Sequence, residues 1–268
     1  MTPRLAASDR PKLLLLGDSL TQLSFEGGGW GSNLANRYQR RADVLNRGMS
    51  GYNTRWYLRY AEENGIWQEP GNIVLVTLFF GANDAALQNR DVAKHVPIPE
   101  YLTNVETIID NISKSYPNAQ ILVISPPPVH REQRLAFQIK RYGDKATGIP
   151  ERTSEHTSKY VGVCREVAEK KKIPYLDMFA AIRNAEGNTD SDDFGRFFHD
   201  GLHFSELGHK LVYDEITEAI RVHFPGLVVR PCPNTGQFNN SSSMCDDIKN
   251  SGPYHDEIDP NEWNKAFD

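Results

Sequence analysis

The fold of this 268-residue chain is decided by residues 12–20, which read Lys-Leu-Leu-Leu-Leu-Gly-Asp-Ser-Leu. A short apolar run that ends at a glycine is typical of a strand buried on both faces, as in parallel sheets. Four further runs of this kind follow along the chain and are bounded by glycine or proline. They lie at residues 44–45, 73–80, 121–124 and 173–178. The sequence therefore predicts five buried strands.

Amphipathic stretches alternate with these runs. They predict helices at residues 31–41, 54–64, 100–115, 153–172 and 205–223. In the third of them, apolar residues recur every three or four positions and form one stripe. Its members are Tyr101, Val105, Ile108, Ile109 and Ile112. Repeated strand-then-helix units predict an α/β fold, a three-layer α/β/α sandwich around a five-stranded parallel sheet. The expected strand order is the flavodoxin-like 2-1-3-4-5, in a single domain over residues 10–225.

The charge is distributed unevenly along the chain. The whole chain has 30 basic and 35 acidic residues and a net charge of −5, but residues 1–230 hold 28 of each. Residues 231–268 hold seven acidic and two basic residues. We interpret residues 226–268 as an acidic C-terminal extension. The neutral body argues against a nucleic-acid or anionic-membrane partner, because such partners require a basic surface.

Composition and cysteine use place the chain in a broad class. An apolar fraction of 39% supports a sizeable core, and the longest apolar stretch, 73–80, is too short to cross a bilayer. The polar N-terminus lacks a signal-peptide layout. The three cysteines (Cys164, Cys232 and Cys245) have no CxxC spacing, so they indicate neither a disulfide framework nor a zinc site, although a Cys232–Cys245 bridge stays open. We expect a cytoplasmic protein without a membrane span, metal or cofactor.

The expected topology brings several polar residues together. In an open parallel sheet, ligands bind beyond the carboxyl ends of the strands, where the strand order reverses. Ser19 follows the first strand and Asn83 the third, so the two should face each other there. Gly51 lies in the loop after the second strand, and Asp200 and His203 lie three residues apart before the last helix. These groups are the parts needed for acyl transfer.

Each of these residues has a chemical role in that reaction. Ser19 needs an adjacent base, and His203, oriented by Asp200, can supply it. The oxyanion of the tetrahedral intermediate needs prearranged donors, each typically worth about 2.7–4 kcal/mol in the transition state. The backbone N–H groups of Ser19 and Gly51 and the Asn83 side chain could provide three.

Structural alternatives remain for most of these residues. Ser19 could be a helix N-cap, and Gly51 or Asn83 could serve only a turn. His199 shares Asp200 as a neighbour and is the nearest rival to His203 as the base. We expect Asp84 to cap the helix that follows it.

Four sequence blocks resemble those of the GDSL/SGNH hydrolases, in the same order. They are Gly17-Asp18-Ser19-Leu20, the segment around Gly51, Gly81-Ala82-Asn83-Asp84 and Asp200-Gly201-Leu202-His203. Residues 11–223 are most similar to the isoamyl acetate-hydrolysing esterase group. The resemblance implies the SGNH hydrolase fold and a serine esterase that uses an acyl-enzyme intermediate. It also implies short-chain acyl esters of small alcohols as substrates, degradation of lipid-like esters and no cofactor.

Other functions and one segment stay open at this point. The same fold could serve a carbohydrate acetyl esterase, a thioesterase, a lysophospholipase or a catalytically silent binding protein, and a homo-oligomer is possible.

Residues 127–150 form an insertion after the fourth strand. It is rich in basic residues, namely Arg131, Arg134, Lys140, Arg141 and Lys145, with Arg152 just beyond. We interpret these as a solvated face, and as an alternative the insertion could be a lid over the site.

Overall fold

The structure is a computed structural model that describes residues 10–185 and 193–230. Its strands are β1 (Lys12–Gly17), β2 (Asp43–Gly48), β3 (Ile73–Phe79), β4 (Gln120–Ile124) and β5 (Tyr175–Leu176). Its α-helices are α1 (Ser19–Gln22), α2 (Trp30–Arg37), α3 (Thr54–Glu63), α4 (Ile98–Ser115), α5 (Arg131–Tyr142), α6 (Ser154–Lys171), α7 (Met178–Asn184) and α8 (Glu206–His223). Five 3-10 turns lie at Leu23–Phe25, Ile66–Gln68, Gly143–Lys145, Asp193–Phe197 and Pro225–Leu227.

The strands form one sheet in the order β2-β1-β3-β4-β5, with every pair parallel. This confirms the predicted fold class and strand order. Two details of the prediction are wrong. The strand β2 is only half buried, because it lies at the sheet edge. The fifth strand is two residues long rather than six, because the Asp177 side chain accepts a hydrogen bond from the Ala180 N–H and thereby starts α7.

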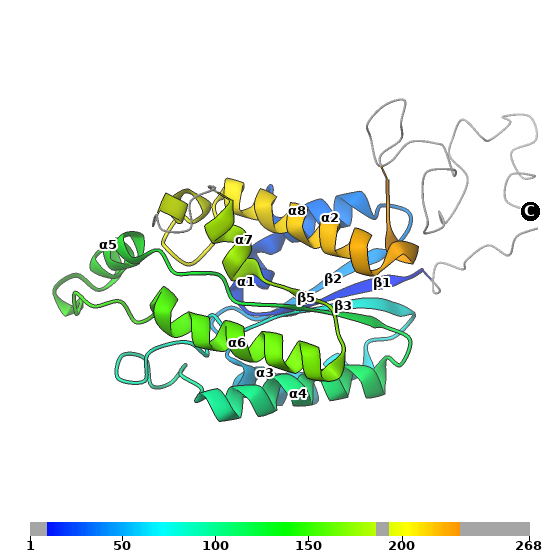
Figure 1. The fold of residues 1–268 in the computed structure, drawn as a ribbon, viewed down its shortest axis with the longest axis horizontal. Coiled ribbons are helices and arrows are strands. Elements are labelled where there is room, and N and C mark those ends of the chain that lie inside the picture. Colours follow the sequence, from blue (N-terminus) through cyan, green and yellow to red (C-terminus); the bar gives the residue numbers. More distant parts are fainter. Residues whose placement is uncertain (1–9, 186–192, 231–268) are drawn as a thin grey trace, which may run out of the picture.

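The sheet lies between two helical layers (Figure 1). One layer holds α2, α7 and α8, and the other holds α3, α4 and α6. Alternate side chains of β1 point to opposite layers, since Leu13 and Leu15 pack in one apolar cluster and Leu14 and Leu16 in the other. This two-sided burial explains why the strand is apolar throughout.

The predicted helices are present with small shifts in their ends. The largest shift is in α2, which ends at Arg37 instead of residue 41, because Arg40 adopts a positive φ of 65°. The predicted stripe on α4 is buried along its whole length. The helix α5 was not predicted. It lies beyond the carboxyl ends of the strands, at the left of Figure 1.

The last described residues pack against the body. Val228 and Val229 are buried, and the Leu227 carbonyl accepts a hydrogen bond from the Tyr38 hydroxyl at 2.6 Å. Residues 226–230 of the proposed extension thus contact α2 and its C-terminal end. The rest of the extension, with Cys232 and Cys245, lies outside the described residues. Within the described ranges, no helix is long and apolar enough to span a bilayer.

Candidate active site

The turn between β1 and α1 positions Ser19. The strand ends at Gly17, Asp18 caps the helix by accepting a hydrogen bond from the Leu20 N–H at 2.9 Å, and Ser19 is the first helical residue. A Cβ at Gly17 would lie 2.0 Å from the Thr21 hydroxyl oxygen and 2.7 Å from the Phe79 carbonyl oxygen. A side chain therefore does not fit there, and glycine permits the tight turn that presents Ser19 at the sheet edge.

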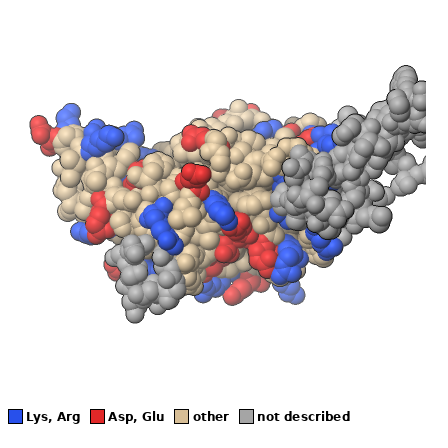
Figure 2. Space-filling model, turned by 90° about the horizontal axis from the view of Figure 1, so that it is seen from above, with Lys and Arg blue, Asp and Glu red and all other residues tan. Residues whose placement is uncertain are grey.

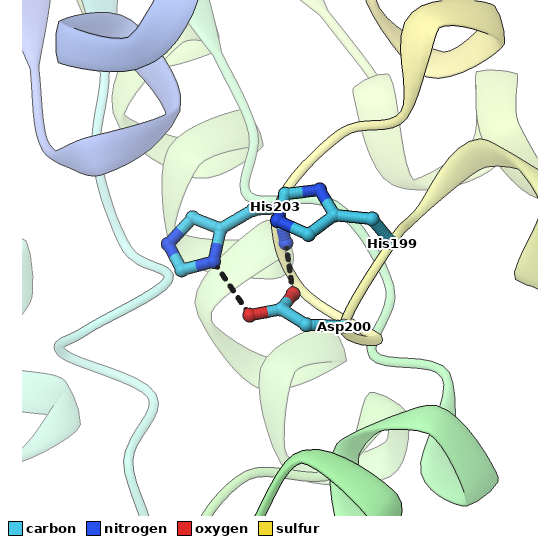
Figure 3. A group of neighbouring side chains, drawn as sticks. All are labelled: His199, Asp200 and His203. Atoms are coloured by element: carbon cyan, nitrogen blue, oxygen red, sulfur yellow. Dashed lines mark hydrogen bonds and ion pairs between the residues drawn. The ribbon is translucent and has the colours of Figure 1, made fainter. Parts of the chain in front are cut away.

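Asp200, His203 and Ser19 form a continuous hydrogen-bonded chain. His203 Nδ1 lies 2.8 Å from Asp200 Oδ2, and His203 Nε2 lies 3.0 Å from Ser19 Oγ. Figure 3 shows the His203 ring beside the Asp200 carboxylate. The other carboxylate oxygen accepts the backbone N–H groups of Leu202 and His203 at 3.0 and 2.8 Å. Because an ionised carboxylate only accepts, Nδ1 carries a proton and Nε2 is free to accept the Ser19 proton.

Asp200 is held in its ionised form. Burial by itself would raise the pKa of Asp200, but the hydrogen bonds and charge of His203, together with the charge of Arg134, outweigh it and hold the pKa well below its usual range. Arg134 Nη1 lies 3.1 Å from Asp200 Oδ2, and both side chains are buried. The Asp200 carboxylate thus keeps a full negative charge with which to orient and stabilise His203.

The three residues expected to supply oxyanion donors, Ser19, Gly51 and Asn83, line the same cavity. Ser19 opens α1, so its N–H has no intrahelical acceptor. Gly51 has a φ of +80°, and the Asn83 side chain donates to the Tyr52 carbonyl at 2.9 Å, which leaves its second amide hydrogen available. Gly51 and Asn83 both lie in turns, and these turn positions are compatible with a donor role. The geometry suits stabilisation of an oxyanion.

Arg152, which the sequence assigned to a solvated face, is buried against Asn83. Its guanidinium donates to Asn83 Oδ1 at 2.9 Å and to the Ala82 carbonyl at 2.7 Å, and it pairs with Glu151 at 2.8 Å. It thereby orients the Asn83 amide, whose nitrogen donates to the Tyr52 carbonyl. The solvated-face interpretation is also wrong for Arg134, which is buried and pairs with Glu151 as well as Asp200.

Two buried carboxyl groups lie behind the site. Burial raises the pKa of Asp18 to about 7 and that of Asp84 to about 6. The prediction that Asp84 caps the helix that follows it is wrong. Its Oδ1 instead accepts the backbone N–H of Thr54 at 2.9 Å, and it also accepts the hydroxyl of that residue at 2.5 Å. The prediction failed because these hydrogen bonds join residues thirty positions apart. They hold the start of α3 against the loop after β3.

Among the described residues, His199, the alternative base, makes no hydrogen bond to Ser19 or to the Asp200 carboxylate. Its Nδ1 lies 3.1 Å from the Phe204 carbonyl oxygen. Its ring stacks on that of His203, with centroids 5.8 Å apart (Figure 3). The three residues His199, Asp200 and His203 are close enough to share a metal ion. Both ring nitrogens of His203 are already engaged, however, one by Asp200 and one by Ser19. The observed arrangement therefore suits proton transfer.

A cavity of about 390 Å³ opens at Ser19. Its described lining includes Gly51, Asn83, Leu202 and His203 and much of the insertion. The residues from the insertion and just after it are Arg134, Phe137, Gln138, Arg141, Tyr142, Lys145, Thr147, Ile149, Glu151 and Arg152. Among the described lining residues there is no tryptophan. The insertion forms one wall of the cavity.

The family assignment follows from comparison with known proteins. The model of the GDSL-like Lipase/Acylhydrolase family matches residues 15–211. The chain belongs to this family. All four sequence blocks of the GDSL-like resemblance lie inside the matched range, and the protein is a hydrolase that acts on esters.

Members of the GDSL-like family in several kingdoms are similar to this chain. A GDSL esterase/lipase of Arabidopsis thaliana is 38% identical over 79% of this chain and 86% of its own length. The isoamyl acetate-hydrolyzing esterase 1 homolog of Mus musculus is 38% identical over 76% and 78%, respectively. The isoamyl acetate-hydrolyzing esterase of Saccharomyces cerevisiae is 33% identical over 81% and 89%. The predicted resemblance is thus confirmed.

Solved structures of GDSL-like enzymes share the fold. A lipase/acylhydrolase from Enterococcus faecalis is 25% identical, with a TM-score of 0.57, over 79% of this chain and 95% of that one. An acetylxylan esterase from Geobacillus stearothermophilus has a TM-score of 0.59 over 81% and 96%, but is only 20% identical. The second likeness concerns the fold alone.

Proposed function

We propose that this GDSL-like hydrolase is a serine esterase that cleaves short-chain acyl esters, of the acetyl type, of small alcohols. The observation that carries the proposal is the chain Asp200–His203–Ser19, with contacts of 2.8 and 3.0 Å. The relatives named for isoamyl acetate hydrolysis support the same substrate class. A cytoplasmic location stays an expectation from the sequence.

The mechanism follows from the positions of these groups. Ser19 Oγ attacks the ester carbonyl while His203 Nε2 takes its proton, and Asp200 stabilises the imidazolium. The Ser19 and Gly51 N–H groups and the Asn83 amide stabilise the oxyanion. His203 then protonates the leaving alcohol. Water, activated by His203, attacks the acyl-enzyme, releases the carboxylic acid and restores Ser19.

The cavity favours short substrates. Its described apolar lining is limited to a few side chains, including Phe137, Ile149 and Leu202, among many polar and charged ones. A long acyl chain would need a larger apolar surface to offset its transfer from water. This argues for an esterase of small esters rather than a lysophospholipase.

Labelling and mutation test the proposal directly. An organophosphonate probe should form an adduct at Ser19, and Ser19→Ala should lower kcat for 4-nitrophenyl acetate by at least about 10⁴-fold. Ser24→Ala, which changes a nearby serine that does not line the cavity, is the matched control and should remain active. Full turnover by Ser19→Ala, or an adduct elsewhere, would refute the proposal. A series of acyl chain lengths should show the highest kcat/KM at acetyl or propionyl.

A further inference from the structure

The cavity at Ser19 has a strong excess of positive charge. Two acidic residues, Asp91 and Glu151, are in its described lining. The basic residues there are Arg90, Lys94, Arg134, Arg141, Lys145 and Arg152. The first 230 residues as a whole carry equal numbers of acidic and basic side chains. The lining of the cavity thus has an excess of basic residues that the body as a whole does not have.

The basic residues in the interior of the cavity wall are already neutralised. Arg134 and Arg152 both pair with Glu151, and Arg134 also pairs with Asp200. These buried charges hold the catalytic groups in place. They are not available for a substrate.

The basic residues at the mouth are different. We call Arg90, Arg141 and Lys145 the cationic rim. All three are exposed, and among the described residues none has a carboxylate in ion-pair contact. Lys94 stands next to them and pairs with Asp91 at 2.9 Å. The rim therefore presents charges without counter-ions to whatever enters the cavity.

Aromatic contacts position one member of the rim. The Arg141 guanidinium lies 5.7 Å from the centre of the Phe137 ring and 5.8 Å from that of Tyr142. Such contacts orient a guanidinium while leaving its N–H donors free. Across the cavity, Lys94 Cε lies 4.0 Å from the position that a Cβ of Gly51 would occupy, so this wall adjoins the oxyanion donors. Several Lys and Arg side chains are visible at the end of the molecule that holds α5, at the left of Figure 2.

We propose that the cationic rim binds an anionic group, a carboxylate or a phosphate, that the ester substrate carries beyond its scissile bond. This inference rests on the proposed esterase function and adds a substrate class to it. Guanidinium and ammonium groups bind such anions through charge-assisted hydrogen bonds, and a cleft with charges of one sign concentrates ligands of the other. The reaction is unchanged: one water is consumed, and a carboxylic acid and an anionic alcohol are released.

Three acetyl esters of similar size test this inference. They are 4-acetoxybenzoate, 4-acetoxyphenyl phosphate and the neutral 4-acetoxybenzamide. At low ionic strength we expect kcat/KM for an anionic ester to exceed that for the neutral one by about tenfold. Salt at about 0.5 M should remove most of this preference, because it screens exposed charges. A preference for either anion supports the rim, and the preferred ester identifies the anion.

Variants then locate the effect. The double variant R141Q/K145Q should lower the ratio of anionic to neutral kcat/KM by about fivefold, since exposed ion pairs contribute modestly to binding. The matched control is Arg131→Gln, an exposed residue of the same helix that does not line the cavity, and its ratio should equal that of the unaltered enzyme. Thermal unfolding of each variant verifies that it is folded.

The possible outcomes distinguish a failure of this inference from a failure of the proposed esterase function. If the probe labels Ser19 and the unlabelled enzyme cleaves the neutral ester with no preference for either anion, the rim proposal is overturned and the esterase proposal stands. The same holds if R141Q/K145Q retains the full preference. No turnover of all three esters, together with an unlabelled Ser19, would overturn both.

Discussion

Arg152 shows how one buried side chain can set the orientation of another. An asparagine amide can present either its oxygen or its nitrogen to a substrate. In this structure Asn83 Oδ1 accepts a hydrogen bond from the Arg152 guanidinium at 2.9 Å, and the Asn83 nitrogen donates to the Tyr52 carbonyl. Asn83 also lines the cavity. We therefore expect Arg152 to act on the reaction by positioning Asn83.

Replacing Arg152 should weaken this orientation. We expect Arg152→Gln to lower kcat about tenfold with little change in KM, because the oxyanion forms only during the reaction. Arg152→Lys should retain part of the activity. In an Asn83→Ala background, Arg152→Gln should have no further effect on kcat. Steady-state kinetics of this double-mutant cycle would contradict the interpretation if the two losses simply multiplied.

Asp18 makes stability depend on pH. Burial raises its pKa to about 7, whereas an unfolded aspartate titrates near 3.9. The folded state therefore holds an extra proton between these values. The contribution of Asp18 to the free energy of unfolding should therefore be most favourable below about pH 4. It should decrease as the pH rises toward 7.

The variant Asp18→Asn removes that titration and keeps an oxygen for the Leu20 N–H. We expect it to be nearly as stable as the unaltered protein at pH 4 and more stable than it at pH 8, by up to about 4 kcal/mol. Urea unfolding at the two pH values measures the difference. An equal difference at both would show that the ionisation of Asp18 is not its cause.

At the scale of elements, α8 depends on a close approach to the 3-10 turn Asp193–Phe197. A Cβ at Gly208 would lie 2.1 Å from the Phe197 carbonyl oxygen. We expect Gly208→Ala to destabilise the protein by about 1–3 kcal/mol through this clash. Gly162, exposed on α6, is the matched control, since a Cβ there meets nothing within 4 Å. Gly162→Ala should instead stabilise by about 0.5–1 kcal/mol, and differential scanning fluorimetry would distinguish the two signs.

At the same scale, the sequence predicts the positions of some site residues but not the wall of the cavity. The residues Ser19, Gly51 and Asn83 could be placed at one edge because each follows a strand, and parallel strands end on the same side. The wall of the cavity could not be foreseen. Arg134 and Arg152 resemble solvent-exposed residues in the sequence, and only their long-range contacts with Asp200, Glu151 and Asn83 show that they are buried. No local pattern signals such pairs.

At the scale of the molecule, the boundary of the folded body can be located by truncation. Removing residues 231–268 keeps Val228 and Val229 in the core, whereas ending the chain at Pro225 exposes the surface they cover. We expect the shorter chain to lose about 2–4 kcal/mol of stability relative to the one ending at Arg230. Both should keep kcat if they fold. Equal melting temperatures would show that residues 226–230 contribute nothing to the body.

The C-terminal end of α8 lies at the end of the sheet where the strands begin, away from α5 (Figure 1). The hydrogen bond between Tyr38 and the Leu227 carbonyl holds the chain that follows α8 against the body. The C-terminus of a chain shortened to Arg230 is therefore a suitable site for attaching the protein to a support. With a tag or surface linker joined there, the end of the molecule that holds α5 and Ser19 would face the solvent and not the support. Immobilised in this orientation, the enzyme should hydrolyse esters as fast as it does free in solution, whereas attachment through α5 would obstruct the entrance.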